Sequence, residues 1–387
     1  MRKHLLFIPG PVTVAEPVLA AMATPMIDHR GPEFAALQAR IVRGLQPIFG
    51  TTAEVVLLGG SGTSGLEAAV SSSFSPGQKV LSCPVGVFGK RLANIAKTFG
   101  LDVEILDTPL GSAVDPALLA ARLAADEAHE IAGILLTHNE TSTGVQNDMA
   151  ALARAIGTHP ATTIVDSVSG LGASEFRMDE WGYDIVAAAS QKALGVPPGA
   201  AMVAVSARAW ERIAQATAPR FYLDLAKARE FAKQGQTPWT PPLSILFALD
   251  VAIERYHAEG APRVWARHAC YAEAIRAFAK ASGIAVFSKP GAHSCTVVAL
   301  KIPERQDAAS IRKSLHDEHG ITIGGGQAEL KGKILRIGTM GDISAADLLD
   351  ALEALDTVLR ARSFEAVPEA GLRAARESLS DAFATTG

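Results

Sequence analysis

The feature that most constrains the fold is a regular alternation of apolar runs and amphipathic stretches between residues 55 and 205. Several intervals carry apolar residues at helical spacing, as in Leu66, Val70 and Phe74 after the first run. Near-continuous apolar strands that alternate with helices are typical of a mostly parallel sheet with both faces covered. The pattern therefore predicts an α/β fold with a sheet of about seven strands. The expected strands are 55–58, 80–82, 103–106, 133–137, 163–166, 184–187 and 201–205.

Prolines mark the beginning of the chain as a separate segment. Pro9, Pro11 and Pro17 disfavour a helix in residues 1–18. We therefore expect an extended N-terminal arm that packs on another part of the protein or on a second subunit.

A second group of prolines, between residues 238 and 242, interrupts the alternation, and the helix expected over 243–257 then stops at Gly260. We therefore place a large domain at 19–260 and a smaller α+β domain at 261–387. The smaller domain is expected to contain strands 284–287, 296–301 and 334–337 and helices 264–281, 308–319, 345–362 and 369–385.

Composition narrows the class of protein and its surroundings. A formal net charge of −4, with 48% hydrophobic and 20% charged residues in 387, is ordinary for a globular chain and argues against nucleic-acid binding. Cys83, Cys270 and Cys295 form no CxxC motif, which favours a reducing compartment and offers no zinc site. The apolar run after Met1 stops at Pro9, and no run approaches a membrane span. We therefore expect a cytoplasmic protein without a membrane partner or a metal.

Two strand ends carry the residues with the clearest chemistry. Lys192 follows the strand 184–187 among small residues, where burial would lower the pKa of its amine and favour a Schiff base. Asp166 ends the strand 163–166, one crossover earlier. Ligands of α/β sheets sit beyond the carboxyl ends of the strands. The pair could hold pyridoxal 5′-phosphate, with Asp166 on the ring nitrogen and Lys192 on the aldehyde. The alternatives are a solvated lysine and a capping aspartate.

The glycine-rich stretch 59–65 lies between an expected strand and an expected helix. Bare N–H groups at a helix N-terminus can hold a phosphate, and Ser61 and Thr63 add hydroxyls. Gly60, Gly62 and Gly65 also match GxGxxG, so a dinucleotide-binding fold is a rival hypothesis. The next expected strand ends without the acid that would hold a ribose, which counts against that rival. A glycine turn without a ligand is the third possibility.

Other polar or aromatic residues at strand ends extend this picture. Phe88 could stack on a planar ring or belong to the core. Thr141 lies in a polar stretch, 137–144, that suits hydrogen bonds to a ligand or a solvated turn. Arg336 interrupts an apolar strand and needs a carboxylate, either from a substrate or from an internal ion pair. His138 has no evident partner and is interpreted as structural.

Taken together, these stretches resemble the class V pyridoxal-phosphate aminotransferases, closest to the alanine–glyoxylate and serine–pyruvate (serine–glyoxylate) group. The resemblance spans nearly the whole chain, in order and spacing. Its motifs are Pro-Gly-Pro (9–11), Gly-Ser-Gly-Thr (60–63), Gly-Val-Phe-Gly (86–89), Thr-His-Asn-Glu-Thr-Ser-Thr-Gly (137–144), Val-Asp-Ser-Val (165–168), Ser-Gln-Lys-Ala-Leu (190–194) and Leu-Arg-Ile-Gly (335–338). It implies the fold-type I architecture, pyridoxal phosphate as cofactor, and a homodimer with active sites at the subunit interface.

Carried over position by position, the resemblance also implies roles for individual residues. Lys192 would be the Schiff-base lysine and Asp166 the partner of the pyridine nitrogen. The phosphate would be held by Ser61, Gly62, Thr63 and Gln191, and by Thr237 and Thr240 of the second subunit. Phe88 would stack on the ring, Thr141 would bond its 3-hydroxyl side, Arg336 would bind the substrate carboxylate, and the backbone around Gly10 would line the pocket.

The implied reaction is a ping-pong transamination from a small amino acid, alanine or serine, to glyoxylate or pyruvate. Two alternatives stay open. A cysteine desulfurase or lyase of the same fold needs a mobile nucleophilic cysteine, whereas Cys295 opens an apolar strand. A dinucleotide-binding protein would use the Gly60–Gly65 loop.

Overall fold

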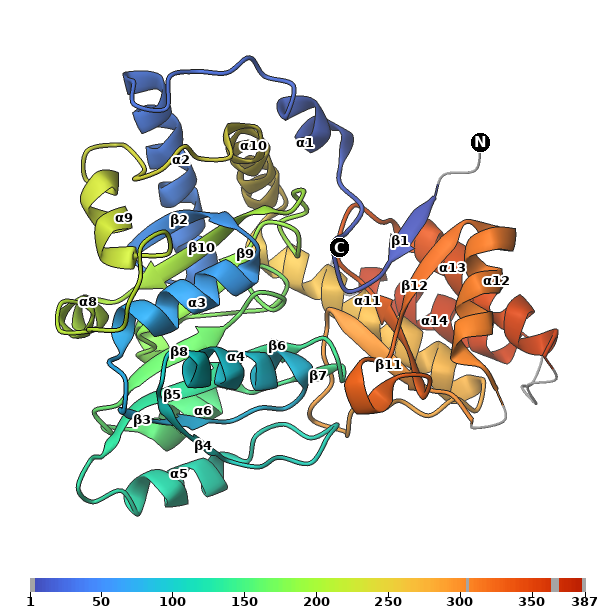
Figure 1. The fold of residues 1–387 in the computed structure, drawn as a ribbon. Coiled ribbons are helices and arrows are strands. Elements are labelled where there is room, and N and C mark those ends of the chain that lie inside the picture. The colour runs from blue at the N-terminus through green and yellow to red at the C-terminus, as the bar shows by residue number, and fades with distance from the viewer. Residues whose placement is uncertain (1–3, 304–305, 363–368, 385–387) are drawn as a thin grey trace.

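The computed structural model describes residues 4–303, 306–362 and 369–384. It contains a seven-stranded sheet, a four-stranded sheet and a small two-stranded hairpin of β6 (Asn139–Glu140) and β7 (Val145–Gln146). Figure 1 shows the two larger sheets side by side, each with its own helices. Among the described residues, no helix has both the length and the apolar character needed to cross a membrane.

The larger sheet has the order β2-β10-β9-β8-β5-β3-β4. Within it only β10 runs antiparallel to its neighbours, so the expected mostly parallel sheet of seven strands is confirmed. Its strands are β2 (Glu54–Gly60), β3 (Lys79–Ser82), β4 (Asp102–Ile105), β5 (Ile131–Thr137), β8 (Thr162–Asp166), β9 (Ile185–Ala189) and β10 (Gly199–Val205).

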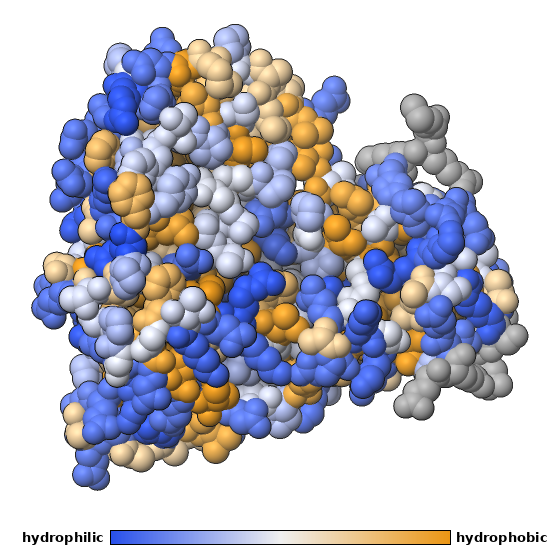
Figure 2. All heavy atoms as spheres, in the orientation of Figure 1, coloured by the Kyte–Doolittle hydropathy of each residue, from blue (hydrophilic) through white to orange (hydrophobic). Residues whose placement is uncertain are grey.

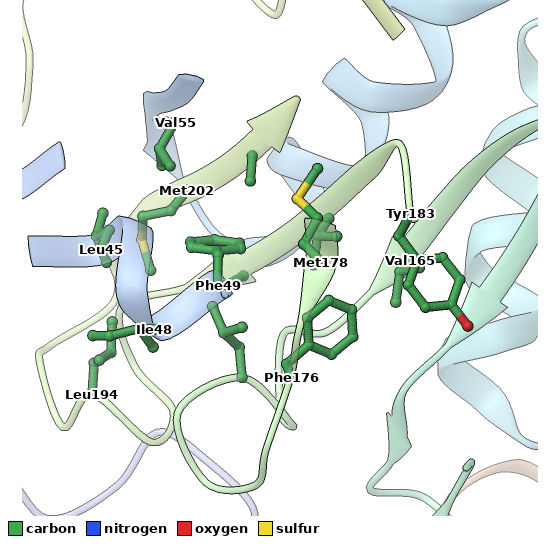
Figure 3. Close-up of a cluster of buried hydrophobic side chains, with 14 of the residues drawn as sticks. Leu45, Ile48, Phe49, Val55, Val165, Phe176, Met178, Tyr183, Leu194 and Met202 are labelled. Carbon is green, nitrogen blue, oxygen red and sulfur yellow. The ribbon is translucent and has the colours of Figure 1, made fainter. Parts of the chain in front are cut away.

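Each face of this sheet is covered by a separate apolar core. Because neighbouring residues of a strand point to opposite faces, Val55 and Leu57 of β2 join one core, and Val56 and Leu58 join the other. The first core is covered by α2 (Pro32–Phe49), α5 (Pro116–Ala124), α6 (Met149–Ile156), α7 (Met178–Trp181) and α10 (Leu243–Glu259). The second is covered by α3 (Gly62–Ser73), α4 (Val87–Thr98), α8 (Ala207–Ile213) and α9 (Leu225–Ala232). Figure 3 shows part of the first core, with Leu45 and Phe49 of α2 beside Met202 of β10.

The smaller sheet has the order β1-β12-β13-β11, and it confirms the expected α+β part of the chain. Its strands are β1 (Leu5–Phe7), β11 (Val297–Lys301), β12 (Ile321–Gly325) and β13 (Ile334–Gly338), and its helices are α11 (Ala261–Ala281), α12 (Ala308–His319), η1 (Ala328–Leu330), α13 (Ala345–Arg360) and α14 (Ala370–Ala384). Strand β1 runs parallel to β12, with Leu5 opposite Ile321. The N-terminal segment therefore completes a sheet that is otherwise built from the last third of the chain.

Three local expectations were wrong. Helix α1 (Glu16–Ala21) begins inside the segment expected to be extended, because Pro17 lies in its first turn, where a missing N–H is tolerated. Residues 284–287 form only an isolated bridge, between Val286 and Leu300. Strand β12 was not predicted, although Ile321 and Ile323 alternate with Thr322 as in a strand. The domain limits at 18 and 260 stay predictions. Parts of the expected arm, small domain and last helix, namely residues 1–3, 363–368 and 385–387, lie outside the described residues.

Candidate active site

The polar residues at the strand ends meet at the carboxyl edge of the larger sheet. The neighbouring strands β5, β8 and β9 are parallel, so their C-terminal loops lie at the same edge. The backbone N–H of His138, after β5, donates to the carbonyl of Asp166 at the end of β8, at 2.8 Å. Gly62 of the glycine turn lies so close that a Cβ there would be 2.5 Å from Val168. Loops that are far apart in sequence therefore form one site.

Lys192 is half-buried, and its ammonium Nζ donates to the carbonyl oxygen of Pro9 at 2.6 Å. Burial, opposed by the charge of Asp166 and assisted by the charges of Arg336 and Arg91, lowers the pKa of Lys192 to about 8. At pH 7.5 about a quarter of such an amine is uncharged, against about one in a thousand for an ordinary lysine. The side chain is therefore poised to react as a nucleophile or a base.

Gly10 lies directly against this lysine. Its backbone φ is +128°, and a Cβ at this position would be 2.8 Å from Nζ of Lys192. Both observations require glycine here, the first for its backbone and the second for space. The N-terminal segment thus lies directly beside Lys192, and the lining of a substrate pocket by the backbone around Gly10 stays a prediction.

Asp166 is 4% exposed, and one of its oxygens, Oδ1, accepts the N–H of Val168 at 3.0 Å. Within the described part of the chain nothing donates to its second oxygen. Burial raises the pKa of Asp166 to about 6, and the hydrogen bond from Val168 and the charges of Lys192 and Arg91 limit the rise. A carboxylate oxygen without a donor of its own suits a cationic N–H donor on a ligand.

The glycine turn presents an open helix N-terminus. Ser61 occupies the cap position of α3, but its side chain makes no capping hydrogen bond. The buried side-chain oxygen of Gln191, next to Lys192, has no hydrogen-bond partner among the described residues. The free N–H groups of α3 and the hydroxyl of Ser61 are donors that a phosphate can bind, whereas the unpaired oxygen of Gln191 is an acceptor.

Phe88 is held by Glu140, a residue that the sequence analysis did not single out. Gly86 at the cap position of α4 has no side chain, and Oε2 of Glu140 instead accepts the N–H groups of Phe88 and Gly89 at 2.9 and 3.0 Å. The other oxygen of Glu140 accepts the N–H and hydroxyl of Ser142. Glu140 therefore caps α4 from another loop, and burial raises its pKa.

Arg336 on β13 is buried and brings the smaller sheet into the site. Its Nε donates to the carbonyl of Gly325 at 2.7 Å, and its Nη1 donates to the carbonyl of Thr141 at 2.8 Å. No described carboxylate lies within salt-bridge distance, so the internal ion pair considered from the sequence is absent from the described structure. The remaining N–H groups of the guanidinium are left for a carboxylate from elsewhere.

Thr237 and Thr240 do not join this group within one chain. Thr237 donates its hydroxyl to the carbonyl of Trp239 at 2.7 Å, and Thr240 is exposed. Both line a shallow pocket with Gly59 and Tyr222. Of the residues described, none around Lys192 contacts either hydroxyl.

The cysteines and His138 carry no comparable chemistry. Burial raises the pKa of Cys295 to about 11 and that of Cys83 to about 12, so both thiols stay protonated. His138 lies between the hydroxyls of Ser167 and Ser174, and burial lowers its pKa to about 4. These surroundings fit structural residues.

A second cluster of titratable groups holds a turn before β5. Asp126, His129 and His159 place one ligand atom each within 4.8 Å of one another. The carboxylate of Asp126, however, already accepts the N–H groups of Glu130 and Ile131 and faces Nε2 of His159 at 3.3 Å.

The sequence analysis also did not single out Arg91. It lies one turn after Phe88 on α4, with its guanidinium 4.7 Å from the centre of the Phe88 ring. Its Nη1 donates to the hydroxyl of Thr63 at 3.2 Å. The i,i+3 spacing from Phe88 was the available signal, since residues at this spacing are neighbours on a helix.

This edge of the sheet fits pyridoxal 5′-phosphate, whose aldehyde, ring nitrogen and phosphate would each meet a complementary group in Lys192, Asp166 and the open end of α3. Fold and site together define a pyridoxal-phosphate-dependent transferase of fold type I. The chain belongs to the class V aminotransferase family, whose model matches residues 20–340. The expected family, fold class and cofactor are thereby confirmed.

Relatives cover nearly the full chain. L-aspartate–glyoxylate aminotransferase of Paracoccus denitrificans is 37% identical over 96% of this chain and 95% of its own. The soluble hydrogenase small subunit of a Synechococcus strain is 38% identical over 98% of this chain and 99% of its own. The structure of ureidoglycine–glyoxylate aminotransferase from Bacillus subtilis has a TM-score of 0.92 and 29% identity, with 98% of this chain and 99% of that chain covered. Family membership, rather than one relative's name, identifies this chain as a pyridoxal-phosphate-dependent transaminase.

Proposed function

We propose that this transaminase moves an amino group from a small amino acid, alanine or serine, to glyoxylate or pyruvate. The observation that carries the proposal is Arg336, a buried guanidinium without a carboxylate partner among the described residues. A 2-oxo acid or an amino acid supplies that carboxylate. Two of the relatives described above are named for glyoxylate, which supports the acceptor.

In this proposal Lys192 is the Schiff-base lysine and the proton carrier. Because a fraction of its amine is uncharged near neutral pH, it can take the proton from the substrate's Cα, and it would deliver that proton to C4′ of the cofactor. The carbonyl of Pro9 orients the amine. When bound, pyridoxal phosphate supplies the electron sink that makes the Cα proton acidic. The free oxygen of Asp166 holds the proton on the ring nitrogen.

The remaining residues of the proposed site bind the cofactor and orient it. Phe88 provides a face for the ring, Thr141 lies on its 3-hydroxyl side, and the backbone at Gly10 limits the pocket beside Lys192. Ser61, Gly62, Thr63 and Gln191 bind the phosphate.

We further propose a homodimer in which Thr237 and Thr240 of one subunit complete the phosphate site of the other. Large apolar side chains that are exposed on one chain support it, namely Leu19, Met26, Phe221 and Tyr222. On the face shown in Figure 2, hydrophobic areas alternate with hydrophilic ones over the part built on the larger sheet, while the part built on the smaller sheet is mostly hydrophilic. A second copy would cover such side chains.

A cytoplasmic location is also proposed. It is supported by Cys83, Cys270 and Cys295, all of which are free thiols. Cell fractionation with an antibody to this chain tests it.

The first test is the visible spectrum of the purified protein, followed by borohydride and peptide mapping. A yellow protein that borohydride bleaches, with the label on Lys192, is the expected result. Lys192→Ala should bind the cofactor without a reducible link and lose nearly all turnover. A protein that stays colourless with added pyridoxal phosphate contradicts the proposal.

Arg336→Ala tests the carboxylate site. The variant loses the charge-assisted hydrogen bonds from Arg336 to the substrate carboxylate, which contribute about 3 kcal/mol. We therefore expect kcat/KM to fall about 100-fold, mainly because KM rises. The affinity for pyridoxal phosphate should not change, which separates a substrate role from structural damage. Donors to screen are alanine, serine and aspartate, each with glyoxylate and pyruvate. Sulfide release from L-cysteine would instead support the desulfurase alternative.

A further inference from the structure

The groups proposed to hold the phosphate carry no positive charge. Ser61, Gly62, Thr63 and Gln191 are neutral, as are the two threonines of the second subunit. A phosphate monoester carries about −1.5 to −2 charges at pH 7, and the helix N-terminus supplies only about half a unit of positive charge. A cation beside the turn would bind such an anion more strongly.

Arg91 is a cation in contact with this turn. Its Nη1 donates to the hydroxyl of Thr63 at 3.2 Å, and its guanidinium lies over the ring of Phe88. Arg91 therefore contacts both Thr63, which is proposed to bind the phosphate, and Phe88, which is proposed to stack on the cofactor ring. Its side chain is exposed, so an incoming ligand can reach it.

Arg91 also forms no ion pair with the described residues, unlike the neighbouring cation Lys90. Lys90 forms an ion pair with Glu329 at 2.7 Å. Glu67 lines the same surface pocket as Arg91, but no described carboxylate lies within salt-bridge distance of the guanidinium. The charge of Arg91 also lowers the pKa of both Lys192 and Asp166, which places it within electrostatic reach of the site.

We propose that Arg91 supplies the positive charge of the phosphate site and thereby retains the cofactor. The inference rests on the proposed function of this site and extends it by one residue. Arg91 acts from the same chain as Lys192, so part of the phosphate affinity does not depend on the second subunit.

The test compares cofactor affinities by absorbance titration of the cofactor-free protein. Arg91→Gln should weaken pyridoxal phosphate about 10- to 100-fold, the range of a charge-assisted hydrogen bond. The affinity for pyridoxal, which lacks the phosphate, should stay the same. Arg91→Lys should recover most of the loss. Lys97→Gln is the matched control, because it removes the same charge two turns further along α4 and should change neither affinity.

A second measurement uses inorganic phosphate as a competitor of pyridoxal phosphate. Phosphate should slow cofactor rebinding to the wild-type protein and have less effect on Arg91→Gln.

Three outcomes overturn the inference. Unchanged affinity of Arg91→Gln for pyridoxal phosphate excludes a phosphate contact. Equal losses for pyridoxal phosphate and pyridoxal show that Arg91 acts only by placing Phe88. A raised KM for aspartate alone, with cofactor affinity intact, assigns Arg91 to a substrate's second carboxylate. A wild-type protein that binds neither compound is distinguishable from all of these, and it removes the proposed function together with the inference.

Discussion

Asp166 is buried and Lys192 is half-buried, and the pKa of each is shifted so that its neutral form is favoured. The pKa of Asp166 is raised to about 6, and that of Lys192 is lowered to about 8. Burial is the largest cause for both, and each group partly offsets the shift of the other. A site of this kind costs folding free energy until a ligand pairs with both groups.

This cost predicts that Asp166→Asn stabilises the cofactor-free protein. Between about pH 4 and pH 6 the folded state holds more protons on Asp166 than the unfolded state, so the free energy of unfolding falls as pH rises through that window. At pH 8 the full cost is present, and the Asp166→Asn variant should have an unfolding free energy higher by up to about 3 kcal/mol. Urea unfolding at pH 5 and pH 8 measures the difference, which should shrink at the lower pH. A destabilised Asp166→Asn at pH 8 contradicts the prediction.

Gly10→Ala tests the close approach to Lys192. The added Cβ would collide with Nζ, and such overpacking costs about 1–3 kcal/mol. We expect the affinity for pyridoxal phosphate to fall about tenfold or more. Gly77→Ala is the control, because Gly77 also has a positive φ but nothing within 4 Å. Both variants should lose stability, and only Gly10→Ala should lose cofactor affinity.

At the residue scale, the sequence indicated those functional side chains that come directly after a strand in the chain. Lys192, Asp166 and the glycine turn could be found because strand ends of α/β sheets meet at one edge. Glu140 could not be assigned a role, because its hydrogen bonds to Phe88 and Gly89 depend on β3 and β5 being neighbours. That pairing is a tertiary property.

At the scale of elements, α4 begins without a cap of its own. Gly86 leaves room for Glu140, since a Cβ at Gly86 would be 2.5 Å from the Glu140 side chain. The loop after β5 therefore fixes both the start of α4 and the position of Phe88.

Glu140→Gln should weaken this junction. Each oxygen of Glu140 accepts two donors, and the amide nitrogen that replaces one of them faces N–H or O–H groups. We expect a loss of about 2–3 kcal/mol in unfolding free energy and a weaker affinity for pyridoxal phosphate. Glu130→Gln, which removes only an exposed ion pair with Lys79, should cost less than about 1 kcal/mol. Equal losses in the two variants would mean that Glu140 is no special cap.

The elements that sequence patterns missed are short. Helix α1 and strand β12 have six and five residues. Their local patterns are weak, and β12 gains its place from pairing with β1 and β13. Long apolar strands and long amphipathic helices were found because the period repeats often enough to be recognised.

At the scale of the whole molecule, the proposed shared sites predict complementation. Lys192→Ala and the double variant Thr237→Ala/Thr240→Ala damage different halves of one site. Each mixed dimer should therefore contain one intact site out of two and have about half of the wild-type activity. The two variants carry different tags and are co-expressed, and the dimers that carry both tags are purified. Their activity is then measured at limiting pyridoxal phosphate. Activity no higher than the average of the two parents would rule out shared sites.

The pairing of β1 with β12 sets an order of events during synthesis on the ribosome. Leu5 emerges first, but its partner Ile321 is made near the end. At about 5–20 residues per second, roughly 15 to 60 seconds pass between the synthesis of β1 and that of β12. The larger sheet can form in that interval, since its strands all lie between residues 54 and 205. The close approach of Gly10 to Lys192 and the contact from Pro9 to Lys192 would then be completed last, so a nascent chain should acquire its core before it can retain its cofactor.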